Sequence, residues 1–186
     1  MLQAQVHLTL PAWLLQDYQQ GQVYADDAAQ VGLAIDLARR NVEYRSGGPF
    51  GAAVFDGEGR LVAAGVNRVV PMSCSVAHAE MMAYMLAQQR TQRLRLNADG
   101  GRYTLATSAQ PCCQCYGATV WAGINTLLIG ARAEDVMELT EFDEGPLPAD
   151  WIGELEKRSI AVRRDIGRHD ARKVLADYAS LGGEGY

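Results

Sequence analysis

The sequence predicts an α/β fold, a three-layer α/β/α sandwich with a central mixed five-stranded sheet. Segments with strand character alternate with segments of helical apolar spacing, and helices between strands place one sheet between two helical layers. The first two strands read as an antiparallel hairpin, whereas the later strands are separated by helices. Hydrophobic residues make up 48% and charged residues 21% of the 186 residues, an ordinary balance for one globular domain.

The chain begins with an apolar but irregular stretch, residues 1–25, which we expect to form an arm that packs against the domain or a partner. Residues 11–15 are suited to a short helix within it. Asp26 and Asp27 then predict a helix through about Tyr44, because one aspartate caps free N–H groups and another favours the helix dipole. Its buried face is predicted by the helical spacing of Val31, Ile35, Ala38 and Val42.

A β-hairpin follows, with strands at residues 50–55 and 60–66 around a turn at residues 56–59. Both strands are rich in Gly and Ala, which indicates that a helix or a ligand approaches them closely. Asn67 stands where the second strand ends. It is either a turn residue or an amide that hydrogen-bonds a substrate beside a metal.

The middle of the chain predicts a loop at residues 71–77, where we expect Cys74 to be a buried small side chain, and then a helix to about residue 90. The methionine-rich face of this helix is interpreted as core. A polar connection leads to a strand at residues 103–108. Pro111 favours a helix start at Cys112, and Gly123 is a suitable C-terminal stop.

The last third begins with a strand at residues 125–130, which is almost wholly apolar, as in a sheet covered on both faces. Short helices at residues 133–139 and 151–157 flank an acidic loop. An alternating strand at residues 160–166, a helix at 170–181 and a flexible tail at 182–186 complete the chain. Without an internal repeat or linker, residues 1–186 are predicted to form one domain.

Two short stretches carry the chemistry: His78-Ala79-Glu80 and Pro111-Cys112-Cys113-Gln114-Cys115. One imidazole and two thiolates give a zinc ion three protein ligands and leave the fourth position open for water, which loses a proton near neutral pH. Cys112 and Cys115 are three residues apart, so one helical turn brings both sulfurs to the same face, and Cys113 points elsewhere. The carboxylate of Glu80 is suited to carry the proton from the water to a leaving amine.

Each stretch alone is unspecific, because a helix often starts with a carboxylate and a Cys-x-x-Cys pair often belongs to a structural zinc or redox site. A structural site would need a fourth protein ligand, and no other His or Cys repeats a ligand spacing. In this order, H-x-E followed by P-C-x-x-C matches the signature of zinc-dependent deaminases.

Charge and cysteine usage limit the partners and the compartment. The net charge is −5, and we interpret the one basic cluster, Arg163, Arg164 and Arg168, as a solvated face, so we expect a small-molecule substrate and no nucleic acid. No apolar run approaches the roughly 20 residues of a membrane span, and residues 1–10 do not resemble a signal peptide. Four cysteines, three of them in one turn, suit a reducing cytoplasm better than a disulfide framework.

On these residues the chain resembles the cytidine and deoxycytidylate deaminase superfamily and, within it, the bacterial guanine deaminases. The first resemblance rests on the two stretches above, and the second rests on residues 48–52, Asn67 and residues 142–144. The similarity covers about residues 26–175. It implies a cytidine deaminase-like five-stranded sheet, one zinc ion per chain, a homodimer, and hydrolysis of guanine to xanthine and ammonia.

The resemblance also implies roles for residues. His78, Cys112 and Cys115 would be the zinc ligands and Glu80 the proton shuttle. Glu144 would be a second catalytic acid, because the N–H edge of guanine needs an acceptor and strand ends face the ligand crevice, with Asp143 as the competing candidate. The positions expected to bind substrate are Asn67, Ala79, Asp143 and Tyr186.

Bacterial guanine deaminases of this type exchange C-terminal segments between protomers, so that a terminal aromatic residue closes the partner's site. Tyr186 would be the terminal aromatic residue here, although three glycines and a glutamate precede it in this chain.

Three other functions stay open on the sequence alone. The first is deamination of another amino-heterocycle or nucleoside, such as an amino-triazine, cytosine, cytidine or guanosine. The second is tRNA adenosine deamination, which the net charge of −5 disfavours. The third is a protein without enzymatic activity whose zinc ion only stabilises the fold. A structural zinc site of this kind would not need the carboxylate of Glu80.

Overall fold

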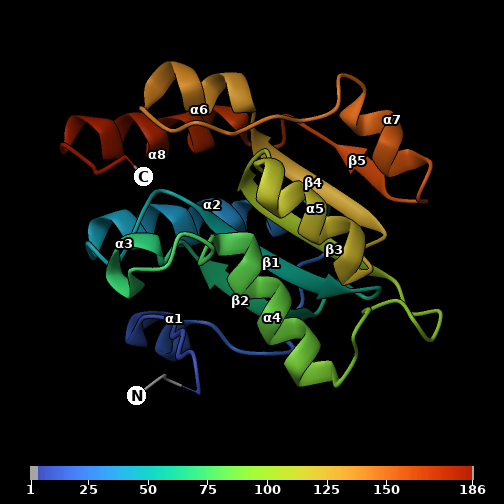
Figure 1. Cartoon of the computed structure of the whole chain (residues 1–186). Coiled ribbons are helices and arrows are strands. Elements are labelled where there is room, and N and C mark those ends of the chain that lie inside the picture. The colour runs from blue at the N-terminus through green and yellow to red at the C-terminus, as the bar shows by residue number, and fades with distance from the viewer. Residues whose placement is uncertain (1–3, 186) are drawn as a thin grey trace.

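Five strands form one mixed sheet in the order β2-β1-β3-β4-β5 in the computed structural model, which describes residues 4–185 (Figure 1). The strands are β1 (Gly51–Asp56), β2 (Leu61–Val66), β3 (Tyr103–Ala109), β4 (Thr126–Ala131) and β5 (Ala161–Arg163). β1 pairs antiparallel with β2 and β3, whereas β3, β4 and β5 are parallel. The mixed five-stranded sheet is therefore confirmed.

Helices cover both faces of this sheet. They are α1 (Ala12–Asp17), α2 (Asp27–Glu43), α3 (Val69–Met72), α4 (Ala79–Thr91), α5 (Cys113–Ala122), α6 (Ala133–Leu139), α7 (Trp151–Glu156) and α8 (Arg168–Ser180). Apolar side chains of α2 and α8 form one core cluster with one face of the sheet, and those of α4 and α5 form a second cluster with the other. Two separate cores confirm the three-layer arrangement.

Glycines in the hairpin mark where the two layers touch the sheet. A Cβ atom at Gly51 would lie 2.4 Å from the carbonyl oxygen of Ala34 in α2, and one at Gly65 would lie 2.2 Å from that of Ala79 in α4. The close approach expected from the small residues in these strands is therefore made by helices. It holds the first turn of α4, with His78 and Glu80, directly over the end of β2.

The N-terminal segment packs along the β2 edge of the sheet, where α1 lies below β2 in Figure 1. Leu14 is buried in the core, and Trp13 Nε1 donates a hydrogen bond to Ser46 Oγ at 3.0 Å. Val23 forms an isolated antiparallel bridge with Arg60. This segment thereby covers part of an edge strand that would otherwise expose unpaired backbone groups.

Three local predictions were wrong in whole or in part. The loop expected at residues 71–77 overlaps the one-turn helix α3, and the strand expected at residues 160–166 is reduced to Ala161–Arg163. Cys74 is half-buried rather than buried. Over the part of the chain that the structure describes, no helix combines the length and apolarity needed to cross a membrane.

Candidate active site

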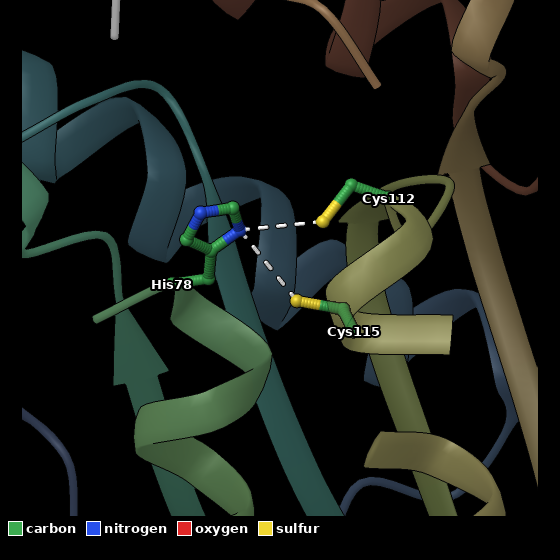
Figure 2. Close-up of side chains that lie close together, drawn as sticks. All are labelled: His78, Cys112 and Cys115. Atoms are coloured by element: carbon green, nitrogen blue, oxygen red, sulfur yellow. Dashed lines mark hydrogen bonds between the residues drawn. The ribbon is translucent and has the colours of Figure 1, made fainter. Parts of the chain in front are cut away.

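Three side chains from two helix starts meet in one cluster. His78 is the N-cap of α4, Cys112 is the N-cap of α5, and Cys115 lies in the first turn of α5. Figure 2 shows both sulfurs directed at the same ring nitrogen, with His78 Nδ1 3.5 Å from Cys112 Sγ and 3.6 Å from Cys115 Sγ. Among the described residues this is the only His, Cys, Asp or Glu group of three or more positioned to bind a metal ion.

The geometry of the cluster fits zinc. Tetrahedral zinc with ligand bonds of about 2.0–2.1 Å to nitrogen and 2.3 Å to sulfur separates the nitrogen from each sulfur by roughly 3.6 Å. The two observed separations, 3.5 and 3.6 Å, agree with that value. Three protein ligands leave a fourth position open, which is typical of a catalytic rather than a structural zinc site.

The two thiols are strongly coupled. Hydrogen bonding from the Cys115 thiol, together with His78, lowers the pKa of Cys112 to about 4 despite its burial. The same hydrogen bond and burial raise the pKa of Cys115. Zinc binds cysteine as the thiolate, so a bound zinc ion would replace this hydrogen bond.

Two carboxylates lie beside the cluster with little access to water. Glu80, in the first turn of α4, is 6% exposed, and its Oε1 lies 3.4 Å from Thr107 Oγ1, whose hydroxyl donates to the Ala109 carbonyl oxygen at 2.9 Å. Burial raises the pKa of Glu80. Glu144 is 9% exposed, and burial, reinforced by the nearby charges of Cys112 and Glu80, raises its pKa to about 8. Both groups are in environments that favour proton uptake, as general acid–base catalysis requires.

One pocket is lined both by residues of the metal-binding cluster and by the two carboxylates. It is lined by Phe50, His78, Glu80, Gln110, Cys112, Phe142, Asp143 and Glu144. The sequence predicted five of these residues and missed Phe50, Gln110 and Phe142. Gln110 follows β3 at the carboxyl end of the β3–β4 parallel pair, so the rule that ligands bind at such ends would have identified it. The two phenylalanines give no comparable signal, because apolar residues beside strands usually belong to the core.

The acidic loop is fastened to the start of α5. The Cys113 N–H donates to the Glu144 carbonyl oxygen at 2.9 Å, and the Gly145 N–H donates to Asp143 Oδ1 at 2.9 Å. Asp143 is exposed whereas Glu144 is buried. Of the two candidate acids, Glu144 therefore has the more enclosed carboxylate.

Two predicted substrate-binding positions, Asn67 and Ala79, lie outside the lining of the pocket. Asn67 is 1% exposed, and its Oδ1 accepts a hydrogen bond from the Val69 N–H at 3.1 Å. The structure records no acceptor for its Nδ2 among residues 4–185. Ala79 is the fully buried first residue of α4. Tyr186 lies outside the described residues.

Comparisons with known proteins identify a zinc-binding family. A sequence model of the cytidine and deoxycytidylate deaminase zinc-binding region matches residues 25–131, more than half of the chain. A solved structure of guanine deaminase from Nitrosomonas europaea is 42% identical, has a TM-score of 0.91, and covers 97% of this chain and 99% of that chain.

Two further similar structures contain purine analogues. One, a variant in complex with 8-azaguanine, is 42% identical with a TM-score of 0.90, over 95% of this chain and 98% of that one. The other, in complex with 2,6-diaminopurine, is 43% identical with a TM-score of 0.91, over 98% of this chain and 96% of that one.

Relatives in the same family act on different substrates. The guanine deaminase of Bacillus subtilis is 32% identical over 68% of this chain and 78% of its own length. A tRNA-specific adenosine deaminase of Buchnera aphidicola is 28% identical over 70% of this chain and 79% of its own length. The zinc-binding geometry, the matched residues and these relatives lead to one conclusion: the chain belongs to the cytidine and deoxycytidylate deaminase family.

Proposed function

We propose that this chain hydrolyses guanine to xanthine and ammonia in a zinc-dependent reaction. The observation that carries the proposal is the pocket that two buried carboxylates, Glu80 and Glu144, line together with His78 and Cys112 of the metal-binding cluster. Similar structures with 42–43% identity that contain 8-azaguanine or 2,6-diaminopurine support a purine base as the ligand.

In this proposal His78, Cys112 and Cys115 hold the zinc ion, which, when bound, supplies the Lewis acidity that makes water nucleophilic near neutral pH. Glu80 takes the proton of the attacking water and passes it to the departing amine. Its raised pKa suits both steps, because a carboxylate in a dry environment accepts a proton readily. The Thr107 hydroxyl lies beside this carboxylate, with its Oγ1 3.4 Å from Glu80 Oε1.

The substrate would be recognised by polar groups around the pocket. We propose that Glu144 accepts a hydrogen bond from the N–H edge of guanine, and that Asn67 Nδ2 and the Ala79 N–H contact other polar atoms of the ring. The Oδ1 bond to Val69 supports this role for Asn67, because it leaves Nδ2 as the available end of the amide. The Ala79 N–H belongs to the first turn of a helix, where N–H groups lack intrahelical acceptors. Asp143 and Tyr186 are the other two residues that we propose to bind the substrate.

Ammonia release across a panel of free bases and nucleosides tests the proposal. We expect guanine to be turned over faster than guanosine, adenine, cytosine, cytidine and amino-triazines, and RNA to leave the rate unchanged. Two of the three arginines in the basic cluster are already paired, Arg163 with Asp27 and Arg168 with Asp135, which supports a small substrate. A better rate with another member of the panel, or with a tRNA, would replace guanine by that substrate.

Zinc content should depend on Cys112 and Cys115. Replacing both by serine removes the two thiolates and leaves one nitrogen ligand, so we expect metal analysis to find little zinc and the assay to find no turnover. Cys113→Ser is the matched control, because Cys113 is exposed on the same turn and lies outside the cluster. Full zinc content in the double serine variant would place the metal elsewhere.

Asn67→Ala should raise KM or lower kcat for guanine. A buried polar group of the ligand left unpaired costs about 1–3 kcal/mol, equivalent to roughly 5- to 150-fold in kcat/KM. Because Oδ1 also holds the Val69 N–H, circular dichroism and thermal unfolding must accompany the kinetics. Unchanged kinetics in a folded variant would leave Asn67 as a turn residue only.

We further propose that the protein is a cytoplasmic homodimer. Trp121 of α5 is 74% exposed, and tryptophan is enriched at the interfaces between protein chains. Light scattering should give twice the mass of one chain, and a monomer mass at micromolar concentration would argue against the dimer. Exchange of C-terminal segments between protomers, with Tyr186 closing the partner's pocket, remains a prediction that a structure of the dimer would test.

A further inference from the structure

The C-terminal end of α8 imposes a defined path on the tail, residues 182–185. The Gly182 N–H donates to the Ala179 carbonyl at 3.0 Å, and the Gly183 N–H donates to the Tyr178 carbonyl at 3.1 Å. Gly182 has a φ of +69°, so these two bonds form a Schellman motif. Such a motif brings the residue after the left-handed position against the side chain five residues earlier, here Gly183 against Tyr178.

The ring of Tyr178 occupies the space that a side chain at position 183 would need. A Cβ atom there would lie 2.2 Å from Cε1 and 2.4 Å from Cζ of that ring. Its φ lies outside the left-handed region, so the backbone itself would accept another residue. The Tyr178 hydroxyl also donates to the Glu184 carbonyl oxygen at 2.9 Å. The tail is thus docked on one tyrosine by a ring contact and a hydrogen bond.

Tyr178 also contacts a residue that lines the proposed catalytic pocket. Its ring is stacked on Phe142, with centroids 6.0 Å apart and an interplanar angle of 16°, and Phe142 packs on Phe50 with centroids 5.1 Å apart. Phe50 and Phe142 both line the pocket, and Phe142 is two residues before Glu144. The bond from the Cys113 N–H to the Glu144 carbonyl oxygen also attaches this loop.

Ion pairs hold the N-terminal part of α8 against α6, and α8 carries Tyr178. Asp135, 1% exposed in α6, accepts two hydrogen bonds of 2.7 Å from Arg168 and also pairs with Arg172. These arginines lower the pKa of Asp135, as expected for a carboxylate held by charge-assisted bonds. α8 therefore presents Tyr178 to the acidic loop from a stable position.

We propose that Tyr178 is a positioning residue for the deamination reaction: its ring holds Phe142 and hence Glu144, and its outer face docks the glycine-rich tail. The inference rests on the proposed function for its effect on turnover, but the docking contact is independent of it. It also explains why the chain approaches its C-terminus through glycines: Gly182 supplies the left-handed turn and Gly183 the space for the ring.

Gly183→Ala is the direct test, with Gly185→Ala as its matched control. A Cβ at Gly185 would lie 3.6 Å from Glu141 Cβ and 3.9 Å from the Glu141 carbonyl oxygen, which are ordinary van der Waals contacts. We expect Gly183→Ala to speed hydrogen exchange of the tail amides and to lower kcat/KM for guanine about 10-fold or more, since displacements of about 1 Å can cost on the order of 10²-fold. Gly185→Ala should change neither. Equal effects of the two variants would overturn the proposal.

A double-mutant cycle separates this contact from a general weakening of the helix end. In the background of Tyr178→Ala the obstructing ring is gone, so Gly183→Ala should have little further effect on exchange or kinetics. Tyr178→Phe keeps the stack on Phe142 and loses only the bond to Glu184, so it should retain most of the turnover that Tyr178→Ala loses at similar thermal stability.

Additive effects of Gly183→Ala and Tyr178→Ala, or equal losses in Tyr178→Phe and Tyr178→Ala, would contradict a positioning role. The exchange measurement needs no substrate. A protein that does not deaminate guanine would therefore refute the proposed function, while the tail contact would still be tested by exchange alone.

Discussion

Glu80→Gln should lose about 10²- to 10⁴-fold in kcat for guanine while keeping its zinc and its fold. The amide preserves the shape of the carboxylate, but it cannot accept a proton from the attacking water. Glu80 is 6% exposed and its pKa is raised by burial, so the neutral amide should also be tolerated without loss of thermal stability. Steady-state ammonia release, metal analysis and thermal unfolding measure the three quantities.

The matched control is Glu134→Gln. Glu134 also lies in the first turn of a helix, α6, but it is exposed and does not line the pocket. Its replacement should leave turnover unchanged. If Glu80→Gln kept a rate near that of the unmodified protein, Glu80 would not be the proton shuttle, and another group in the pocket would have to carry the proton.

Most elements of the fold were predictable because their signals are local. Asp26 was expected to cap α2, and its carboxylate accepts a hydrogen bond from the Ala29 N–H at 2.8 Å. Gly123 was expected to stop α5, and it has a φ of +79° at the C-cap. Each of these residues determines a helix end by its own chemistry, without help from distant parts of the chain.

The elements that were missed depend on contacts that a local pattern does not contain. α3 is held by bonds from outside it, including the Val69 N–H to Asn67 Oδ1. The alternating pattern from residue 160 to residue 166 is longer than β5, because Asp165 adopts a φ of +66° and pairs with Arg132. Once the chain turns there, only Ala161–Arg163 remain paired with β4.

The residues of the proposed site were likewise predictable only in part. The spacing of His78, Cys112 and Cys115 encodes the metal cluster, since each helix start orients its own ligand. The aromatic wall of the pocket, Phe50 and Phe142, comes from segments that are adjacent only after folding. An apolar residue carries no mark that separates a core position from a pocket position, and so this wall required the structure.

Glu144→Gln is expected to abolish most guanine turnover, whereas Asp143→Asn should do less. The reasoning starts from guanine, which loses the amino group on carbon 2 between two ring nitrogens. The nitrogen that bears hydrogen is a donor and needs an acceptor, and attack at the carbon requires a proton on a ring nitrogen and another on the amine. Glu80 alone would have to serve every transfer, so a second carboxylate in the pocket would share the task.

The structure favours Glu144 over Asp143 as this second carboxylate. Glu144 is 9% exposed, and its carbonyl oxygen accepts a hydrogen bond from the Cys113 N–H at the start of the helix that holds both cysteines. Asp143 also lines the pocket, but it is exposed and its Oδ1 is occupied by the Gly145 N–H. An acid that is to be protonated and deprotonated in each cycle benefits from a raised pKa, and burial raises that of Glu144 to about 8.

Glu144→Gln should therefore reduce kcat for guanine by about 10²- to 10⁴-fold with zinc content and thermal stability retained. Glu141→Gln is the control, because Glu141 is an exposed acid of the same loop that does not line the pocket. If Asp143→Asn proved more damaging than Glu144→Gln, the role would belong to Asp143. If neither slowed guanine turnover, the loop would only close the pocket, and Glu80 would have to carry every proton of the reaction.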